Sequence, residues 1–212
     1  MRHDTFGLSR LEASSVHAAR SISATAVVRS IRLKKLNAIT AAFCGVVPAA
    51  ILGFAFPAKT GRYLIGFLVG ILWSNAFEYF YHRCLLHGTT TTLAQHHMEH
   101  HAASGTADEA DHVNFGESPR WVALLFVVNG AVVVAADLLL GLRIAPGILA
   151  AFSVYFIALE EIHWRIHLDR WLPPSLRATK IHHLRHHGRP NARFNVFLPL
   201  FDWVCGTKAS IG

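Results

Sequence analysis

The sequence predicts an all-α integral membrane protein with about four transmembrane helices and a helical cap rich in histidine. Three observations support this fold class. Hydrophobic residues make up 52% of the 212 residues, charged residues make up 16%, and the mean hydropathy is +0.34, which is a balance typical of membrane proteins. The chain contains four separate apolar runs of near-membrane length. Twelve of the fifteen histidines fall into four short clusters, each at or near the end of an apolar segment.

The four apolar runs are expected to form two hairpins. The expected spans are residues 36–56, 63–81, 121–141 and 148–162. Short turns join the first span to the second and the third to the fourth, so the intervening loop and the C-terminal tail lie on the same side as the N-terminus. We therefore expect one membrane domain, residues 36–212, whose cap is formed by residues 82–120 and 163–212. A buried helix bundle in a soluble protein is the less favoured alternative, because four separate runs of this length are unusual there.

Charge predicts the orientation of the domain. The net charge is +7, and the basic residues flank the apolar spans instead of forming a patch interleaved with aromatic residues, so no nucleic-acid partner is expected. More of them lie on the side of the chain ends than at the hairpin turns, which places that side, with every histidine cluster, in the cytoplasm. Residues 1–35 are expected to be a basic, flexible tail, with an organelle transit peptide as the alternative. Three widely spaced cysteines indicate no disulfide framework and a reducing compartment.

The spacing of the histidines is that of metal ligands on helices. Neutral imidazole offers a lone pair near pH 7, which makes histidine the commonest metal ligand in proteins. In HWRIH, His163 and His167 are four positions apart and share one face of a helix. Two triplets with positions i, i+3 and i+4 are also expected to share a face: His97, His100 and His101, and His183, His186 and His187.

The pair His82 and His87 breaks this pattern. Five positions are off-register for a regular α-helix, so the pair requires either a frayed helix end or ligands that converge on two different metals. A surface pair is the alternative for any one cluster taken alone, but four clusters together favour metal binding. Ten histidines exceed what one ion with four to six ligands would bind, so we expect two metals.

The four histidine motifs resemble a known family. The order HRCLLH, HMEHH, HWRIH and HLRHH is similar to that of the fatty acid hydroxylase (sterol desaturase-like) superfamily, and the spacing H-x4-H, H-x2-HH, H-x3-H, H-x2-HH is closest to its fatty acyl 2-hydroxylase branch. EYFYHR, KIHHLRHH and the ending FNVFLPLFDWVCGT extend the resemblance, which covers residues 43–208. As a set the motifs are specific, although each alone is weak.

The resemblance implies a set of site residues. The ten implied metal ligands are His82, His87, His97, His100, His101, His163, His167, His183, His186 and His187. His96 and His182 each lie four positions before an implied ligand and are expected to be hydrogen-bonding neighbours or additional ligands. Glu78 and Glu160 lie on helical faces shared with implied ligands, where they could orient imidazoles by hydrogen bonding.

The resemblance also implies an activity. It implies two metal ions, iron with zinc as the alternative, and O₂ as co-substrate in the hydroxylation of a fatty acyl chain or fatty acyl lipid, at carbon 2 by analogy with the closest branch. The substrate would enter from the bilayer, along a path that could be lined by Phe67, Trp73, Phe77, Phe80 and Tyr81. No cytochrome domain is expected within these residues, so electrons would come from a separate protein of the cytochrome or ferredoxin type.

Two alternative functions stay open at this point. Within the same superfamily, the chain could be a carotenoid or sterol-type hydroxylase or desaturase. From another class, it could be a non-catalytic metal-binding or metal-transport membrane protein. Transport requires ligands near the middle of the spans, whereas the histidine clusters are expected at one face of the membrane, which favours catalysis.

Overall fold

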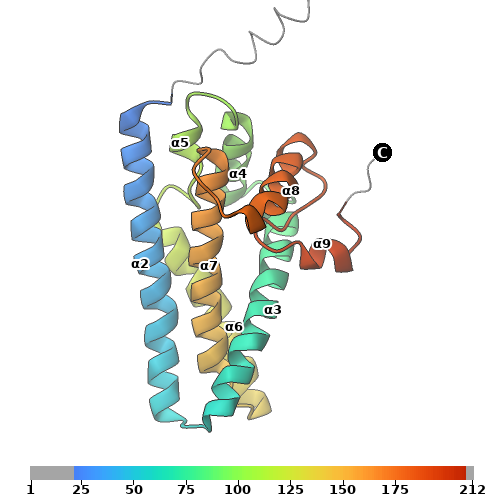
Figure 1. Cartoon of the computed structure of the whole chain (residues 1–212). Helices are drawn as coiled ribbons and strands as arrows, with labels where there is room; N and C mark the ends of the chain where they lie inside the picture. Colours follow the sequence, from blue (N-terminus) through green and yellow to red (C-terminus); the bar gives the residue numbers. More distant parts are fainter. Residues whose placement is uncertain (1–21, 209–212) are drawn as a thin grey trace, which may run out of the picture.

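Helix α7 lies among the three other long helices of an all-helical bundle. The computed structural model describes residues 22–208. The long helices are α2 (Ala24–Ala55), α3 (Thr60–Phe80), α6 (Pro119–Leu140) and α7 (Ala145–His167). Helix α7 packs closely against both α2 and α3, and α6 packs mainly against α2 (Figure 1). No β-strand occurs within residues 22–208, so the predicted fold class is confirmed.

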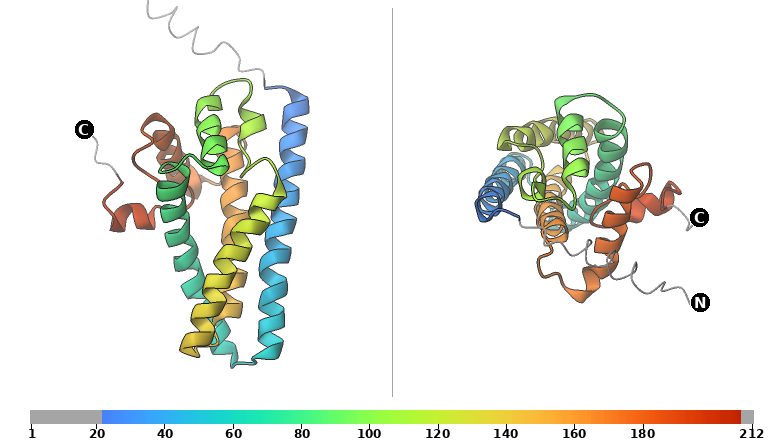
Figure 2. Two further views of the ribbon diagram at one scale, coloured as in Figure 1. Left: turned by 180° about the vertical axis from the view of Figure 1, so that it is seen from behind. Right: turned by 90° about the horizontal axis from the view of Figure 1, so that it is seen from above.

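The shorter helices gather at one end of this bundle. Helices α4 (Thr92–Ala103), α5 (Glu109–His112) and α8 (Arg177–Gly188) lie at the end where α2 begins and α7 ends, as Figures 1 and 2 show. The turns that join α2 to α3 and α6 to α7 lie at the opposite end. A 3₁₀ turn (Pro174–Leu176) precedes α8, and the short helix α9 (Leu200–Val204) lies beside α3. The expected pair of hairpins with a cap at one end is therefore present.

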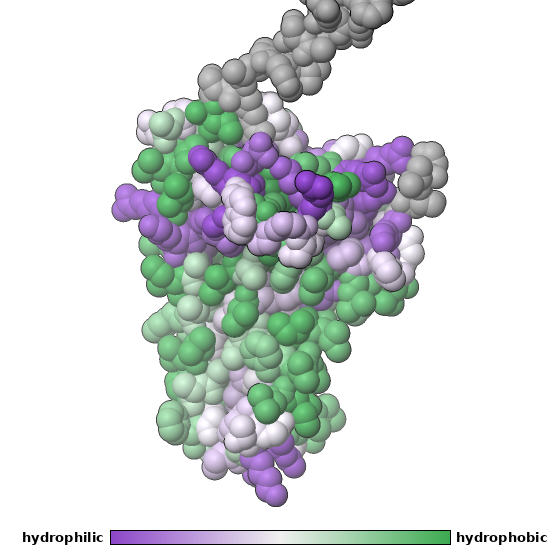
Figure 3. Space-filling view, viewed as in Figure 1, coloured by the Kyte–Doolittle hydropathy of each residue, from purple (hydrophilic) through white to green (hydrophobic). Residues whose placement is uncertain are grey.

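All four long helices are long and apolar enough to cross a membrane. The candidate segments are Ala24–Ala55, Thr60–Leu86, Pro119–Leu140 and Ala145–His167. Their outer surface is apolar over most of the bundle, as the green lower part of Figure 3 shows. Leu68 is 67% exposed and Leu139 is 86% exposed. An apolar exterior of this extent matches a lipid environment, since the hydrocarbon core is roughly 30 Å thick and a helix needs about 20 residues to cross it.

The first long helix begins earlier than the sequence suggested. Residues 24–35, expected to be part of a flexible tail, form the first turns of α2. They are helical because they pack on the end of α7: Trp164 Nε1 donates to Ser30 Oγ at 2.8 Å, and Lys34 Nζ lies 2.6 Å from Glu161. Residues 1–21 of the expected tail lie outside the described residues.

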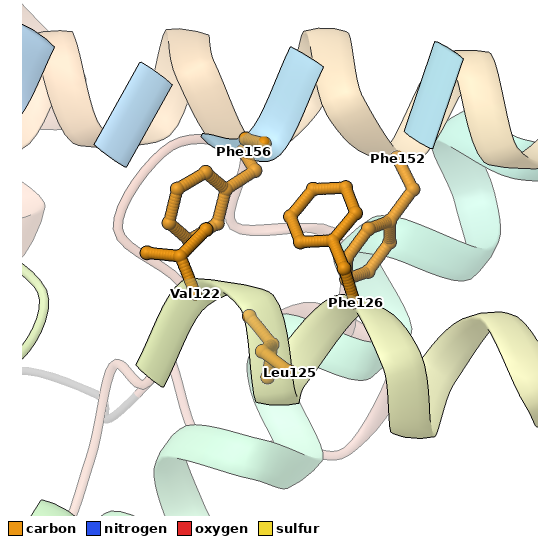
Figure 4. Close-up of a cluster of buried hydrophobic side chains, with 6 residues drawn as sticks. Val122, Leu125, Phe126, Phe152 and Phe156 are labelled. Atoms are coloured by element: carbon orange, nitrogen blue, oxygen red, sulfur yellow. The ribbon is translucent and has the colours of Figure 1, made fainter. Parts of the chain in front are cut away.

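Aromatic side chains join α6 to α7 below the cap. Phe126 of α6 packs against Phe152 and Phe156 of α7, with ring centroids 5.0 and 5.7 Å apart and tilted edge-to-face geometry (Figure 4). Val122 and Leu125 of α6 and Ala41 of α2 complete this buried cluster. Such ring pairs contribute about 0.5–1.5 kcal/mol each beyond the area they bury. The cluster fixes the position of the α7 segment that leads to His163.

Glycines permit the close approach of α3 and α7. A Cβ atom on Gly147 would lie 2.2 Å from the main-chain oxygen of Tyr63, and one on Gly70 would lie 2.6 Å from the Cβ of Ala151. Small residues at such crossings let helix backbones pack by van der Waals contact, which matters in lipid because apolar side chains gain little by leaving it. Larger residues here would separate the two helices that carry His82 and His163.

Candidate metal centre

A single π-helical turn places His82 and His87 together. Residues Tyr81–Leu86 continue α3 as a π-helix, and the amide of His87 donates to the carbonyl of His82 at 3.1 Å. In a π-helical turn, residues five positions apart lie on one face of the helix. Such turns are frequent at functional sites. The two Nε2 atoms are 3.2 Å apart. The pair therefore requires neither a frayed helix end nor ligands that converge on two different metals.

Five histidines form what we call the first group. They come from the π-helix, α4 and α8, and their ligand atoms all lie within 4.8 Å of one another. Neighbouring Nε2 atoms are 2.9–3.2 Å apart. The members of the first group are His82, His87, His97, His101 and His186.

Five further histidines form the second group. They come from α4, α7 and α8, and their ligand atoms meet the same 4.8 Å limit. The Nε2 distances between neighbours are 2.8–3.2 Å. The members of the second group are His100, His163, His167, His183 and His187. All ten histidines implied by the sequence therefore come together, although that they bind metal stays a prediction.

Helices α4 and α8 each contribute to both groups. On α4, His97 and His101 point to the first group while His100 points to the second. Residues four apart differ by about 40° around a helix, whereas adjacent residues differ by about 100°. Each triplet therefore divides between the groups instead of presenting one common face. The division brings the groups side by side, with the rings of His101 and His187 stacked at 4.2 Å.

The distances within each group fit a metal ion. A metal–nitrogen bond is about 2.1 Å, so two nitrogens at right angles around one ion are about 3.0 Å apart, close to the observed spacing. The same spacing is unfavourable without a cation, because lone pairs would face one another. His82 and His186 show this, since each has its Nδ1 engaged with a main-chain carbonyl and its Nε2 directed at the group. The residues present fit two metal ions.

The ligand atoms are held in the neutral form that metals require. Burial lowers the pKa of His97, His100 and His183 well below its usual range, and the neighbouring histidines lower it further. Burial also lowers the pKa of His101 to about 3 and that of His187 to about 2. Near pH 7 these imidazoles are uncharged, so their lone pairs are available without loss of a proton.

Hydrogen bonds from Nδ1 orient several of the ten imidazoles. His82 Nδ1 donates to the carbonyl of Phe194, and His186 Nδ1 donates to the carbonyl of Ala192 at 2.7 Å. His167 Nδ1 donates to the carboxylate of Glu109 at 2.5 Å. These bonds fix the tautomer and leave Nε2 as the free lone pair. Sequence reasoning did not identify Glu109, because it lies 58 positions from His167 and outside every motif.

Glu78 acts on the backbone and not directly on an imidazole. Its two carboxylate oxygens accept from the amide of Val196 at 2.5 Å, from Asn195 Nδ2 at 3.0 Å and from the Tyr155 hydroxyl at 2.6 Å. The segment that it anchors carries the carbonyl of Phe194, which accepts from His82. Glu78 therefore supports His82 indirectly, through the main chain of residues 194–196.

Glu160 also makes its hydrogen bonds away from the histidines. Its Oε1 accepts from Asn37 Nδ2 at 2.8 Å and from the amide of Phe115 at 3.3 Å. These bonds tie α7 to α2 and to the loop before α6. The expected role of Glu160 in orienting an imidazole has no support among these bonds.

His96 and His182 lie outside both groups. His96 Nδ1 faces Glu99 and Glu117 at 3.4 Å each. His182 Nε2 donates to Asp202 at 3.0 Å, and Asp202 also accepts from the amide of Phe194 at 2.9 Å. His182 thus helps to position Asp202, which in turn holds the main chain of residues 194–195 in place.

An apolar cavity opens onto both histidine groups. It is lined by His82 and His97 of the first group and by His100, His163 and His183 of the second. One face of α7 forms its long wall, through Phe152, Tyr155, Phe156, Leu159, Glu160 and His163. With a rise of 1.5 Å per residue, this wall extends about 16 Å from the histidines toward the middle of the bundle.

The aromatic residues expected along a substrate path divide between two roles. Phe77 and Tyr81 line the cavity. Trp73 instead donates to Asn129 at 2.8 Å, and Phe80 packs against Phe201 with ring centroids 6.1 Å apart. Phe67 is not among the lining residues.

Comparison with known proteins gives two matches. A family described as fatty acid hydroxylase matches residues 67–207, which is more than half of the chain. A solved structure described as full-length scs7p, with only its hydroxylase domain visible, is similar with a TM-score of 0.58 and 19% sequence identity, covering 80% of this chain and 67% of that one. At this identity the likeness shows the fold alone. None of the curated proteins compared with the chain matches it.

Proposed function

This chain belongs to the fatty acid hydroxylase family, and from that premise we propose that it is a membrane-bound di-iron enzyme that uses O₂ to hydroxylate the acyl chain of a lipid. The observation that carries the proposal is that two five-histidine groups lie side by side at the cap end of one apolar cavity. The resemblance of the histidine spacing to fatty acyl 2-hydroxylases makes carbon 2 the first position to examine.

The donor set supports iron. Each group offers five neutral nitrogens with a spacing close to the 3.0 Å expected for right angles, whereas a four-coordinate tetrahedral zinc site would separate its nitrogens by about 3.4 Å. Five ligands also leave one position of an octahedron open. Iron bound there would supply the reduction of O₂ and the attack on an unactivated C–H bond.

The residues of the chain hold the substrate and exclude water. Phe77, Phe152 and Phe156 give the cavity apolar walls, which favour an alkyl chain and keep bulk water from the reacting carbon. The long wall on α7 positions the chain along the helix, so one carbon lies opposite the histidines. Fixing that carbon provides the regioselectivity of the reaction through orientation.

The proposal includes a placement in the membrane. The four long helices would cross the bilayer, with the cap and both histidine groups on the cytoplasmic side, and the substrate would enter from the lipid phase. Electrons would be delivered at the cap by a separate protein of the cytochrome or ferredoxin type.

The test is lipid analysis under ¹⁸O₂ of cells that express the wild type, His183→Ala or His96→Ala, with the metal content of each purified protein. We expect a labelled hydroxy-lipid and about two irons per chain with the wild type and His96→Ala, and no labelled lipid with His183→Ala. His96→Ala is the matched control, because it removes a cap histidine that lies outside both groups. Bound metals without a labelled product would assign a non-catalytic role, and absence of bound metal in the wild type would refute the metal centre.

A further inference from the structure

The two histidine groups differ in the charge of the atoms that orient them. We propose that Glu109 makes the second group the tighter of the two metal sites, so that this group fills first and releases its metal last. The inference rests on the proposed di-metal function and goes beyond it, because it ranks the two sites and assigns the cause to one residue.

Glu109 is a buried carboxylate in direct contact with the second group. Glu109 is only 1% exposed to solvent. One carboxylate oxygen accepts from His167 Nδ1 at 2.5 Å, and the other accepts from the amide of Gly105 at 2.7 Å.

The first group is oriented by neutral acceptors. Its members His82 and His186 donate to the main-chain carbonyls of Phe194 and Ala192. The carboxylate of Asp202 interacts electrostatically with His186, but the hydrogen bonds that it accepts come from the amide of Phe194 and from His182, whereas Glu109 accepts directly from a group member, His167. A carbonyl fixes the tautomer as well as a carboxylate does, but it brings no net negative charge.

This difference matters because every ligand is neutral. Five imidazoles around a divalent ion leave two positive charges uncompensated in a buried, largely apolar site, where charge is costly. The Glu109 carboxylate lies one imidazole ring away from the second site and compensates part of that charge. It also makes His167 a more basic ligand. Loss of such a partner lowers metal affinity by about 10- to 100-fold.

The ranking predicts an order of assembly. A first equivalent of metal occupies the second group, which joins α4, α7 and α8 through His100, His163 and His183. That metal fixes α4 and α8, and with them His97, His101 and His186 of the first group. The second equivalent then binds to a site that is already ordered.

Chelator competition with Co²⁺ tests the ranking on the whole protein. We expect two resolved steps for the wild type, with affinities that differ by about 10-fold or more. His187→Ala should remove the tighter step and His87→Ala the weaker one, which assigns each step to a group. The cobalt absorption spectrum follows each site independently of activity.

Glu109→Gln tests the cause. The amide keeps the size of the side chain and an oxygen that can accept from His167, but it removes the charge. We expect the tighter step to weaken by about 10- to 100-fold while the weaker step is unchanged. The control is Asp111→Asn, the same change of carboxylate to amide on the same short helix, where Asp111 pairs with Arg29 and contacts neither group.

The outcomes separate this inference from the proposed function. Fewer than two bound metals in the wild type would contradict the di-metal centre itself. Two bound metals of equal affinity would overturn only the ranking, and so would assignment of the tighter step to the first group. A Glu109→Gln protein with both steps unchanged, or with both weakened equally, would overturn the role of Glu109.

Discussion

His82 and His87 lie at the two ends of one π-helical turn, with their Nε2 atoms 3.2 Å apart. The turn adds one residue to a helical repeat and thereby aligns two side chains that an α-helix would place about 140° apart. Both join the first histidine group, and each faces a histidine of another helix. The less regular turn is therefore what brings both side chains into one group.

Removal of one ligand from either group should lower the metal content selectively. His87→Ala removes a ligand of the first group and His187→Ala a ligand of the second, so each protein should retain about one metal per chain after dialysis, because four neutral ligands bind more weakly than five. Metal analysis of the purified proteins measures this. His96→Ala should retain two metals. Loss of both metals from either variant would mean that the groups form one indivisible site.

Loss of Glu78 should destabilise the fold and weaken the first group. Glu78→Ala leaves the amide of Val196 and the Tyr155 hydroxyl without the acceptor that they use, and it removes one of two acceptors of Asn195 Nδ2. Each buried donor left unsatisfied costs about 1–3 kcal/mol, so the free energy of unfolding should fall by about 2 kcal/mol or more.

Unfolding in detergent measures the effect of Glu78→Ala, with Glu161→Ala as the control. Glu161 is also a carboxylate near the cap, but its side chain is 37% exposed and pairs with Lys34 and Arg165, so its loss should cost less than about 1 kcal/mol. Equal destabilisation by the two variants would contradict the anchoring role of Glu78.

Enlarging the far end of the cavity should shift the preference of the enzyme to longer chains. Phe152 lines the cavity and packs against Phe77 and Phe126 with ring centroids 5.3 and 5.0 Å apart. Phe152→Leu shortens this side chain while it preserves an apolar wall, so products with longer acyl chains should increase relative to shorter ones.

Product profiling of a mixed-chain lipid substrate measures this shift in chain length. The control is Leu139→Ala. Leu139 lies near the C-terminus of α6 with its side chain 86% exposed, so this change should leave the product profile unaltered. An unaltered profile for Phe152→Leu would show that the chain does not reach this wall.

The metal-free protein should lose stability as the pH falls below about 6.5. Burial lowers the pKa of His101 to about 3 and that of His187 to about 2, whereas in the unfolded chain a histidine titrates near 6.5. Between these values the unfolded state binds protons that the folded state does not, so the free energy of unfolding decreases as the pH falls through this window. Melting curves with a chelator from pH 7.5 to pH 4 measure the effect. A melting temperature that rises or stays constant on acidification would contradict the neutral cluster.

Native cysteines should report the side of the membrane on which the cap lies. Cys84 and Cys205 are exposed near the cap end of the molecule, so a membrane-impermeant thiol reagent should label them in inside-out vesicles and not in right-side-out vesicles. The Cys84→Ser, Cys205→Ser double variant should lose this labelling. Labelling in right-side-out vesicles alone would place the cap outside the cytoplasm.

The helical membrane fold and most of the histidines of the candidate centre could be predicted from the sequence alone. Span length and hydropathy are local properties, so the four long helices followed from composition along the chain, with differences only at their ends. Histidine is a rare residue with a specific chemistry, so its clustering selected twelve candidates, and the family resemblance selected among them the ten that the structure brings together.

The division of those residues into two groups, and the contacts that support them, depend on tertiary packing. The assignment of His100 to one group and His97 and His101 to the other depends on how α4 meets α7 and α8. Glu109 is 58 positions from His167, and Glu78 is 118 positions from Val196. Such pairs have no local pattern, because hydrogen bonding between distant segments depends on the packing of helices in space. His82 and His87 are another example. Their five-residue spacing is off-register for an α-helix, but the π-helical turn of the folded chain aligns them.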